Sequence, residues 1–233
     1  MIKVVVLDFD DTLCMTEEVC FYMENDILES MGLLAMSRET HKKNWGMALA
    51  AAIAQRAPGV DVEEFMKRIE KLTSKYHATG KFDTISNENL QSLDELKKAG
   101  YKLAILTSRS IAEMRHLLHG DHPLSERIER FYHKDNSTFL KPDPRVFDQV
   151  FEDFNVTPVE CVYVGDTPTD AQAAKGANMH FIALLESGLR TEEDFSEYEV
   201  DFFAKKFPDI IRMLPASSAA STATSPRRTA RKS

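Results

Sequence analysis

The sequence has few cysteines and no long hydrophobic run, and both absences narrow the class of protein. Its 233 residues include three cysteines, at positions 14, 20 and 161. Because their number is odd and no C-x-x-C spacing occurs, a secreted disulfide scaffold is disfavoured and a reducing compartment is favoured. The longest apolar stretch, residues 46–54, is too short to span a bilayer. We therefore expect a cytoplasmic protein with no membrane partner.

A glycine-rich phosphate loop is also missing from the sequence. Neither G-x-G-x-x-G nor G-x-x-x-x-G-K occurs, so we expect no nucleotide cofactor bound in that way. The formal net charge is −8 at pH 7, yet residues 216–233 contain no acidic residue and four basic ones, namely Arg227, Arg228, Arg231 and Lys232. The rest of the chain is therefore more acidic than the total, which disfavours a nucleic-acid partner. Residues 216–233 are rich in Ser, Ala and Thr and predict a disordered basic tail.

Strand and helix patterns alternate over most of the chain. A β-branched run at residues 2–7 predicts a buried strand, and further strands are expected at 101–107, 128–132, 160–164, 179–184 and 201–204. Helices are expected at 86–99, at 111–118, after Pro144, before Gly176 and at 208–214. This alternation predicts right-handed crossovers and a parallel sheet, which is an α/β fold with a Rossmann-like doubly wound core.

An all-helical segment interrupts this core directly after the first strand. No strand pattern occurs between residue 14 and about residue 85, and three helices are expected there. The first begins with Thr16 as its N-cap, the second covers 37–57 and the third covers 61–78. Two domains follow from this pattern: an α/β core of residues 1–14 and 87–215, and an inserted helical domain of residues 15–86.

Acidic pairs follow two of the predicted strands. Asp8 and Asp10 come directly after the first strand, where alternation starts both side chains on one face. Two carboxylates this close repel unless a cation or a shared proton compensates. Gly165 and Asp166 follow Val164 at the end of another strand, with Asp170 near the start of the next helix. The carboxylates of Asp166 and Asp170 at this strand end suit a hard cation better than they suit a plain cap, whereas Asp8 and Asp10 alone could be turn or helix-cap residues.

Two other segments carry polar residues that could hold a phosphate group. Thr107 and Ser108 end a strand, where hydroxyl and backbone N–H groups can bind a phosphate oxygen, and a plain helix cap is the alternative. Lys141 precedes a proline and, taken alone, is typical of a solvated surface. Ligands in open α/β sheets bind beyond the carboxyl ends of the strands, so these residues and the acidic pairs are expected at one edge.

Four motifs follow one another along the chain: Asp-x-Asp-x-Thr, a strand-terminal Thr, Lys-Pro and Gly-Asp-x-x-x-Asp. This order resembles that of the haloacid dehalogenase-like hydrolase superfamily, in its phosphatase branch. The resemblance covers residues 2 to about 214, and the helical segment stands where that family places its type-one cap. It implies a Mg²⁺-dependent phosphatase that hydrolyses a small phosphorylated metabolite through an aspartyl-phosphate intermediate.

The resemblance also implies a role for each motif residue. Asp8 would be the nucleophile and Asp10 the general acid and base, with Thr12 orienting Asp10. The implied Mg²⁺ site consists of Asp8, Asp10 through its backbone carbonyl, Asp166 and Asp170, of which Asp170 would alternatively hold Lys141. The implied phosphate and substrate contacts are Thr107, Ser108, Arg109 and Lys141, with Thr107 and Lys141 also catalytic.

Several alternatives stay open at this point. A dehalogenase does not need the general acid Asp10, and Asp11, where many relatives have glycine, disfavours a sugar-phosphate mutase. A phosphonate hydrolase needs a Schiff-base lysine in the helical segment, where the available lysines are Lys42, Lys43, Lys67, Lys71 and Lys75. A non-catalytic binding or regulatory protein on the same fold is the alternative from another class. The substrate stays open among sugar phosphates, nucleoside monophosphates and phosphoglycolate-type acids, and the oligomeric state is not predicted.

Three further patterns are interpreted as structural. His116, His119 and His122 could suggest a metal site, but Gly120 and Pro123 break their helix. Trp45 in the helical segment could contact a substrate, but it is expected to pack in the core on the apolar face of an amphipathic helix. Asp11 is expected to be a turn residue.

Overall fold

The computed structural model describes residues 1–43, 45, 49–79 and 82–214, and it contains one parallel sheet of six strands in the order β3-β2-β1-β4-β5-β6. The strands are β1 (Val4–Leu7), β2 (Lys102–Leu106), β3 (Arg130–Tyr132), β4 (Cys161–Gly165), β5 (His180–Leu184) and β6 (Phe202–Ala204). The predicted α/β class with a Rossmann-like parallel sheet is therefore confirmed. The predicted basic tail at 216–233 lies outside the described residues.

Helices fill the connections between the strands. The α-helices are α1 (Thr16–Ser30), α2 (Arg38–Lys43), α3 (Leu49–Arg56), α4 (Val62–Ala78), α5 (Asn87–Lys98), α6 (Ile111–Met114), α7 (Asp148–Phe154), α8 (Pro168–Gly176) and α9 (Ile210–Met213). The 3-10 helices are η1 (Arg115–Leu118), η2 (Pro144–Phe147), η3 (Pro158–Glu160), η4 (Glu192–Phe195) and η5 (Phe207–Asp209). Within the described residues, no helix has the length and apolar character that a membrane crossing requires.

The central strand β1 is buried on both faces. Val5 and Leu7 belong to one hydrophobic cluster, with side chains of α5 and α9, whereas Val4 and Val6 belong to another, with side chains of α7 and α8. A strand covered on both faces needs apolar residues at every position, which explains the uninterrupted run in the sequence. In the register of the sheet, Leu7 lies beside β2 on one side and β4 on the other.

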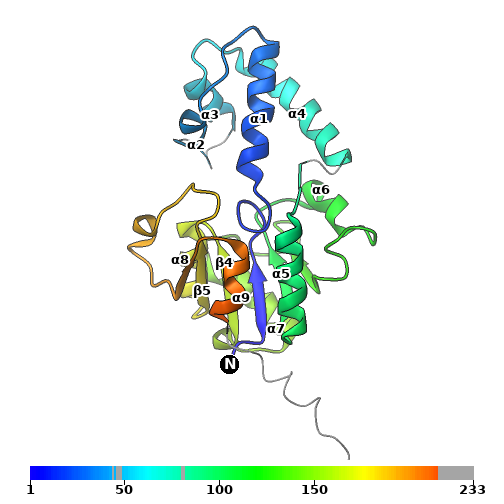
Figure 1. The fold of residues 1–233 in the computed structure, drawn as a ribbon, viewed down its shortest axis with the longest axis vertical. Coiled ribbons are helices and arrows are strands. Elements are labelled where there is room, and N and C mark those ends of the chain that lie inside the picture. The colour runs from blue at the N-terminus through cyan, green and yellow to red at the C-terminus, as the bar shows by residue number, and fades with distance from the viewer. Residues whose placement is uncertain (44, 46–48, 80–81, 215–233) are drawn as a thin grey trace, which may run out of the picture.

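Helices α1–α4 form a group of their own between β1 and α5, and we call it the helical group. Figure 1 shows it beyond the end of the sheet that β1 points toward, away from the N-terminus. It has its own hydrophobic cluster, in which Met23, Leu28, Ile53 and Phe65 are buried. The predicted all-helical insertion after the first strand is therefore present.

The start of α1 differs from the prediction. Thr16 is the first residue of the helix rather than its N-cap, and its hydroxyl donates to Asp10 Oδ1 at 2.6 Å. The acceptor for the helix N-terminus is Asp11, whose Oδ1 accepts from the backbone N–H of Glu17 at 2.9 Å. A carboxylate at this place also interacts favourably with the helix dipole.

The helix predicted over 37–57 is also wrong as a single element. In the described residues, α2 ends at Lys43 and α3 begins at Leu49. Trp45 between them lies in a turn, and its backbone N–H donates to Lys42 O at 3.1 Å.

Candidate active site

The site forms at the carboxyl ends of the central strands. Asp8 directly follows β1, Thr107 directly follows β2, and Asp166 directly follows β4. The backbone N–H of Asp8 donates to Val164 O at 2.8 Å, which holds the ends of β1 and β4 together. Between β1 and β4 the direction of the crossovers reverses, and this is the place where ligands bind in such sheets.

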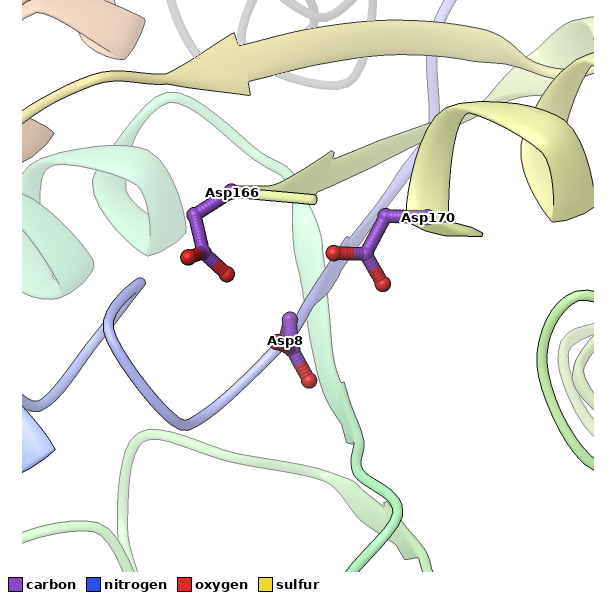
Figure 2. A group of neighbouring side chains, drawn as sticks. All are labelled: Asp8, Asp166 and Asp170. Atoms are coloured by element: carbon purple, nitrogen blue, oxygen red, sulfur yellow. The ribbon is translucent and has the colours of Figure 1, made fainter. Parts of the chain in front are cut away.

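Three buried carboxylates meet at this edge. Asp8, Asp166 and Asp170 each offer an oxygen, and these oxygens lie within 4.8 Å of one another. Figure 2 shows the three side chains converging from the ends of β1 and β4 and the start of α8. Burial raises the pKa of Asp8 to about 7, and burial together with Asp170 and Asp8 raises the pKa of Asp166 well above its ordinary value. Three such charges cannot coexist out of water without positive charge nearby.

Lys141 supplies part of that positive charge. Its Nζ donates to Asp170 Oδ1 at 2.7 Å, to Asp8 Oδ1 at 2.9 Å and to the Tyr163 hydroxyl at 3.0 Å. Burial lowers the pKa of Lys141, but the nearby carboxylates of Asp170 and Asp8 raise it well above its ordinary value. The lysine that the sequence alone would place on a solvated surface is thus a buried ammonium beside Asp8.

Asp170 is held mainly as the partner of Lys141. Its Oδ2 accepts from the backbone N–H of Thr167 at 3.0 Å and from the Thr167 hydroxyl at 2.6 Å, in a capping box at the start of α8. A Cβ on Gly165 would lie 2.7 Å from side-chain atoms of Asp170, so only glycine permits this approach. Both oxygens of Asp170 therefore have protein partners.

The remaining carboxylates fit a divalent cation. Asp166 has one long hydrogen bond, from the Thr12 hydroxyl at 3.4 Å, although its side chain is buried. Asp8 and Asp170 share the ammonium group of Lys141, and Asp166 forms no ion pair in the described part of the chain, so negative charge remains that protein side chains there do not neutralise. Hard oxygen donors of this kind suit Mg²⁺. Asp8 and Asp166 are the carboxylates best placed to hold it.

The carboxylate of Asp10 lies apart from this cluster. It accepts from Arg109 Nε at 2.9 Å, from a terminal nitrogen of Arg109 at 2.5 Å and from the Thr16 hydroxyl at 2.6 Å. Thr12, which was expected to orient Asp10, faces Asp166 instead, and Thr16 takes its place.

Arg109 connects the core with Asp83, which lies between α4 and α5 in the chain. The other terminal nitrogen of its guanidinium donates to Asp83 Oδ1 at 2.7 Å, and Asp83 follows α4 in the chain. Phe9 and Phe82 lie against the guanidinium of Arg109, whose side chain is 8% exposed. Its groups are engaged by protein acceptors, so its predicted contact with a phosphate group stays a prediction.

A cavity of about 280 Å³ opens beside the carboxylates. Its walls include residues that the sequence analysis did not place there: Trp45, Leu189 and Arg190. Trp45 Nε1 donates to Asp11 Oδ2 at 2.9 Å, so Asp11 is both a turn residue, at a φ of 55°, and a buried acceptor. No spacing rule connects Trp45 or Arg190 to the motifs, and only the fold brings them together.

Comparison with known proteins agrees with this geometry. A sequence model of the haloacid dehalogenase-like hydrolase family matches residues 5–184, which is more than half of the chain. The chain belongs to the haloacid dehalogenase-like hydrolase family. The resemblance of its motifs and the prediction of a hydrolase are thereby confirmed.

Relatives of this haloacid dehalogenase-like hydrolase include named phosphatases. A phosphoglycolate phosphatase of Nitrosospira multiformis is 26% identical over 223 residues, covering 93% of this chain and 97% of that protein. A glyceraldehyde 3-phosphate phosphatase of Pyrococcus furiosus is 26% identical, covering 91% and 93%. The fold is shared with the crystal structure of a subfamily IA hydrolase of this superfamily from Geobacter sulfurreducens, with a TM-score of 0.70, 24% identity and coverage of 92% and 97%.

Proposed function

We propose that the protein is a Mg²⁺-dependent phosphatase that hydrolyses a small phosphorylated metabolite through an aspartyl-phosphate on Asp8. The observation that carries this proposal is the convergence of three buried carboxylates at the sheet edge, two of which form ion pairs with the buried Lys141. The names of the relatives, which include phosphatases of phosphoglycolate and of glyceraldehyde 3-phosphate, support it.

In this proposal the metal site consists of Asp8, Asp166 and the backbone carbonyl of Asp10, with Asp170 supporting it through Lys141. When bound, Mg²⁺ would offset the charge of the phosphoryl oxygens. Lys141 would stabilise the same charge from the protein side, because its ammonium lies 2.9 Å from the Asp8 carboxylate. Thr107 and Ser108 would donate hydrogen bonds to the phosphoryl group from the end of β2.

Two displacements at phosphorus make up the proposed reaction. A carboxylate oxygen of Asp8 bonds to phosphorus, the bond from phosphorus to the ester oxygen breaks, and Asp10 gives the leaving alkoxide a proton. Water then attacks phosphorus while Asp10 takes a proton from it, so inorganic phosphate leaves and the Asp8 carboxylate is restored. The hydrogen bonds from Arg109 and Thr16 fix the position of Asp10 for both transfers.

We also propose that residues 15–86 act as a cap domain on a core of residues 1–14 and 87–215. The helical group contributes Trp45 to the cavity wall, and Lys42 Nζ donates to Ser187 O at 2.9 Å in the loop after β5. A cap that closes in this way would exclude water from the phosphoryl group and limit the size of the substrate.

Hydrolysis of 4-nitrophenyl phosphate tests this function. We expect turnover with Mg²⁺, its loss with EDTA, and a fall of at least about 10³-fold in kcat for Asp8→Asn, because the nucleophile is removed. Asp94→Asn, which changes an exposed aspartate on α5, is the matched control and should keep full activity. A folded protein that hydrolyses no member of a broad phosphate-ester panel with Mg²⁺ would favour the non-catalytic alternative.

The metal site has a readout that does not depend on activity. A cation that binds only the folded chain increases the free energy of unfolding, by about 2.7 kcal/mol at 100 times its Kd, and therefore raises Tm. We expect Mg²⁺ to raise the Tm of the wild-type protein and of Asp94→Asn but not of Asp166→Asn. Equal stabilisation of all three proteins by Mg²⁺ contradicts the assignment of Asp166.

A further inference from the structure

The cavity beside the carboxylates contains a second cation that the proposed chemistry does not use. The loop after β5 brings Leu189 and Arg190 to the same wall as Asp8, Lys141 and Asp166. Arg190 is partly buried, and it stands in the sequence far from every motif of the site. Its position therefore calls for a role other than phosphoryl transfer.

The charged groups of the cavity differ in how fully they are engaged. Lys141 is committed to Asp8 and Asp170, as two ion pairs below 3 Å show. The hydrogen bond that the Arg190 guanidinium makes is to the carbonyl of the preceding residue, Leu189, at 3.1 Å. In the part of the chain that the structure describes, Arg190 forms no ion pair within 4.0 Å, and Asp194 is an acidic residue that it influences from a longer distance. Arg190 is thus the cation of this wall that can receive an anionic group from a ligand.

The acidic residues of the wall do not compete for Arg190. Asp10 is held by Arg109 and Thr16, whereas Asp11 accepts from the indole of Trp45 and from the backbone of α1. The carboxylates of Asp8 and Asp166 face the Lys141 side and the proposed metal. A substrate whose phosphoryl group lies at Asp8 would therefore meet Arg190 with its remaining part.

The size of the cavity limits what that remaining part can be. Its volume of about 280 Å³ lies just below the range of about 300–1,000 Å³ that is usual for small-molecule sites. A compact ester fits such a volume better than a nucleotide does. A carboxylate is the smallest anionic group that matches the planar fork of an arginine with two parallel hydrogen bonds.

We propose that Arg190 binds a carboxylate of the substrate, and that the substrate class is a small phosphorylated carboxylic acid. This inference rests on the proposed phosphatase function and deepens it. Arg190 then determines specificity, because it contacts the part of the substrate that does not react. An arginine–carboxylate contact of this kind distinguishes an acid from a neutral ester of the same size.

The test compares two esters that differ in one group. The esters are 2-phosphoglycolate and ethyl phosphate, in which a methyl group replaces the carboxylate. The ratio of their kcat/KM values is measured with Mg²⁺ for the wild-type protein and for Arg190→Gln. Dividing the two ratios cancels the different intrinsic reactivities of the esters. We expect the ratio to fall by about 10–100-fold in Arg190→Gln, the usual effect of losing charge-assisted hydrogen bonds, and Arg190→Lys to restore part of it.

Two controls separate specificity from other effects. Arg212→Gln changes an exposed arginine on α9 and should leave the ratio unchanged. If Arg190→Gln leaves the ratio as it is, even while both kcat/KM values fall together, the assignment of Arg190 is overturned. The phosphatase function itself fails in a different way, namely when the wild-type protein hydrolyses neither of these esters nor 4-nitrophenyl phosphate.

Discussion

The core side and the helical side of the cavity are held by contacts of different kinds. On the core side, Asp8, Asp170 and Lys141 have side chains at most 8% exposed and form ion pairs of 2.7–2.9 Å. On the helical side, Trp45 and Lys42 are half-buried, and each makes a polar contact with the core at 2.9 Å.

This difference indicates that the two sides of the site have different roles. Breaking a buried ion pair leaves an uncompensated charge and costs about 3–5 kcal/mol, whereas a partly exposed hydrogen bond contributes about 0.5–1.5 kcal/mol. The sheet therefore holds the reacting groups in one arrangement. The contacts of Trp45 and Lys42 with the core can open at small cost, as the entry and exit of a ligand require, whereas the buried Arg109–Asp83 pair near the connection to α5 stays closed.

The largest expected difference comes from replacing a lysine by methionine on the core side and on the helical side of the cavity. Lys141→Met removes the ammonium beside Asp8, and kcat should fall by about 10²–10³-fold, the usual effect of losing one preorganised electrostatic donor. Lys42→Met removes a single contact with a backbone carbonyl, so its kcat should change by less than about 10-fold. Steady-state kinetics with 4-nitrophenyl phosphate measures both. Similar losses in the two variants would refute the contrast between the sides.

A smaller effect is expected from the glycine that gives Asp170 its place. In Gly165→Ala the new methyl group collides with Asp170 at 2.7 Å, so Asp170 and its partner Lys141 must shift. Overpacking of this kind costs about 1–3 kcal/mol, and we expect kcat to fall by about 10-fold or more. Gly120→Ala is the matched control, because its Cβ would meet nothing within 4 Å. Unchanged kcat in Gly165→Ala would show that Asp170 does not position Lys141.

The helical side should respond more weakly. Trp45→Phe keeps an aromatic ring in the wall but removes the hydrogen bond to Asp11, so kcat/KM should fall by about 3–10-fold. Tyr22→Phe removes a hydroxyl from an exposed residue of α1 and serves as its control. If Trp45→Phe lost as much activity as Lys141→Met, the contacts of the helical side would be as important for catalysis as those of the core.

The smallest expected effect concerns the interior of the helical group. His41 is fully buried, with Nδ1 2.7 Å from Glu17 Oε1 and Nε2 3.2 Å from Glu24 Oε1. Burial lowers the pKa of His41, but the hydrogen bond to Glu17 and the nearby carboxylate of Glu24 raise it above its ordinary value. A folded-state pKa above the unfolded value of about 6.5 adds stability that is complete below that value and is lost as pH rises through the folded pKa.

Thermal unfolding at several pH values checks this prediction. The Tm of the wild-type protein should decrease from about pH 6 to above neutral pH, and part of that decrease should be absent in His41→Gln. Burial also raises the pKa of Asp11 to about 7, so only the difference between the profiles of the wild-type protein and His41→Gln is assigned to His41. Parallel pH profiles of the two proteins would show that His41 carries no extra proton in the folded state.

Much of the core could be predicted from local patterns. The run at residues 2–7 indicated a central strand because a strand buried on both faces leaves no position for a polar residue. The convergence of Asp8 and Asp166 followed from a general property of parallel sheets, whose carboxyl ends meet at one edge. The helix expected at residues 86–99 is also present, and Ser86 is the N-cap of α5, where its side chain accepts from the N–H of Asn89.

The sequence by itself thus determined which strands end in polar residues, and hence where a phosphate and a cation could meet. Only the tertiary structure decided which of these groups already have partners. Arg109 is engaged by Asp10 and Asp83, whereas Arg190 faces the cavity. The two arginines are indistinguishable as sequence letters. Local periodicity reports the direction of each side chain from its own backbone, but the partner of a charge depends on packing between segments far apart in the chain.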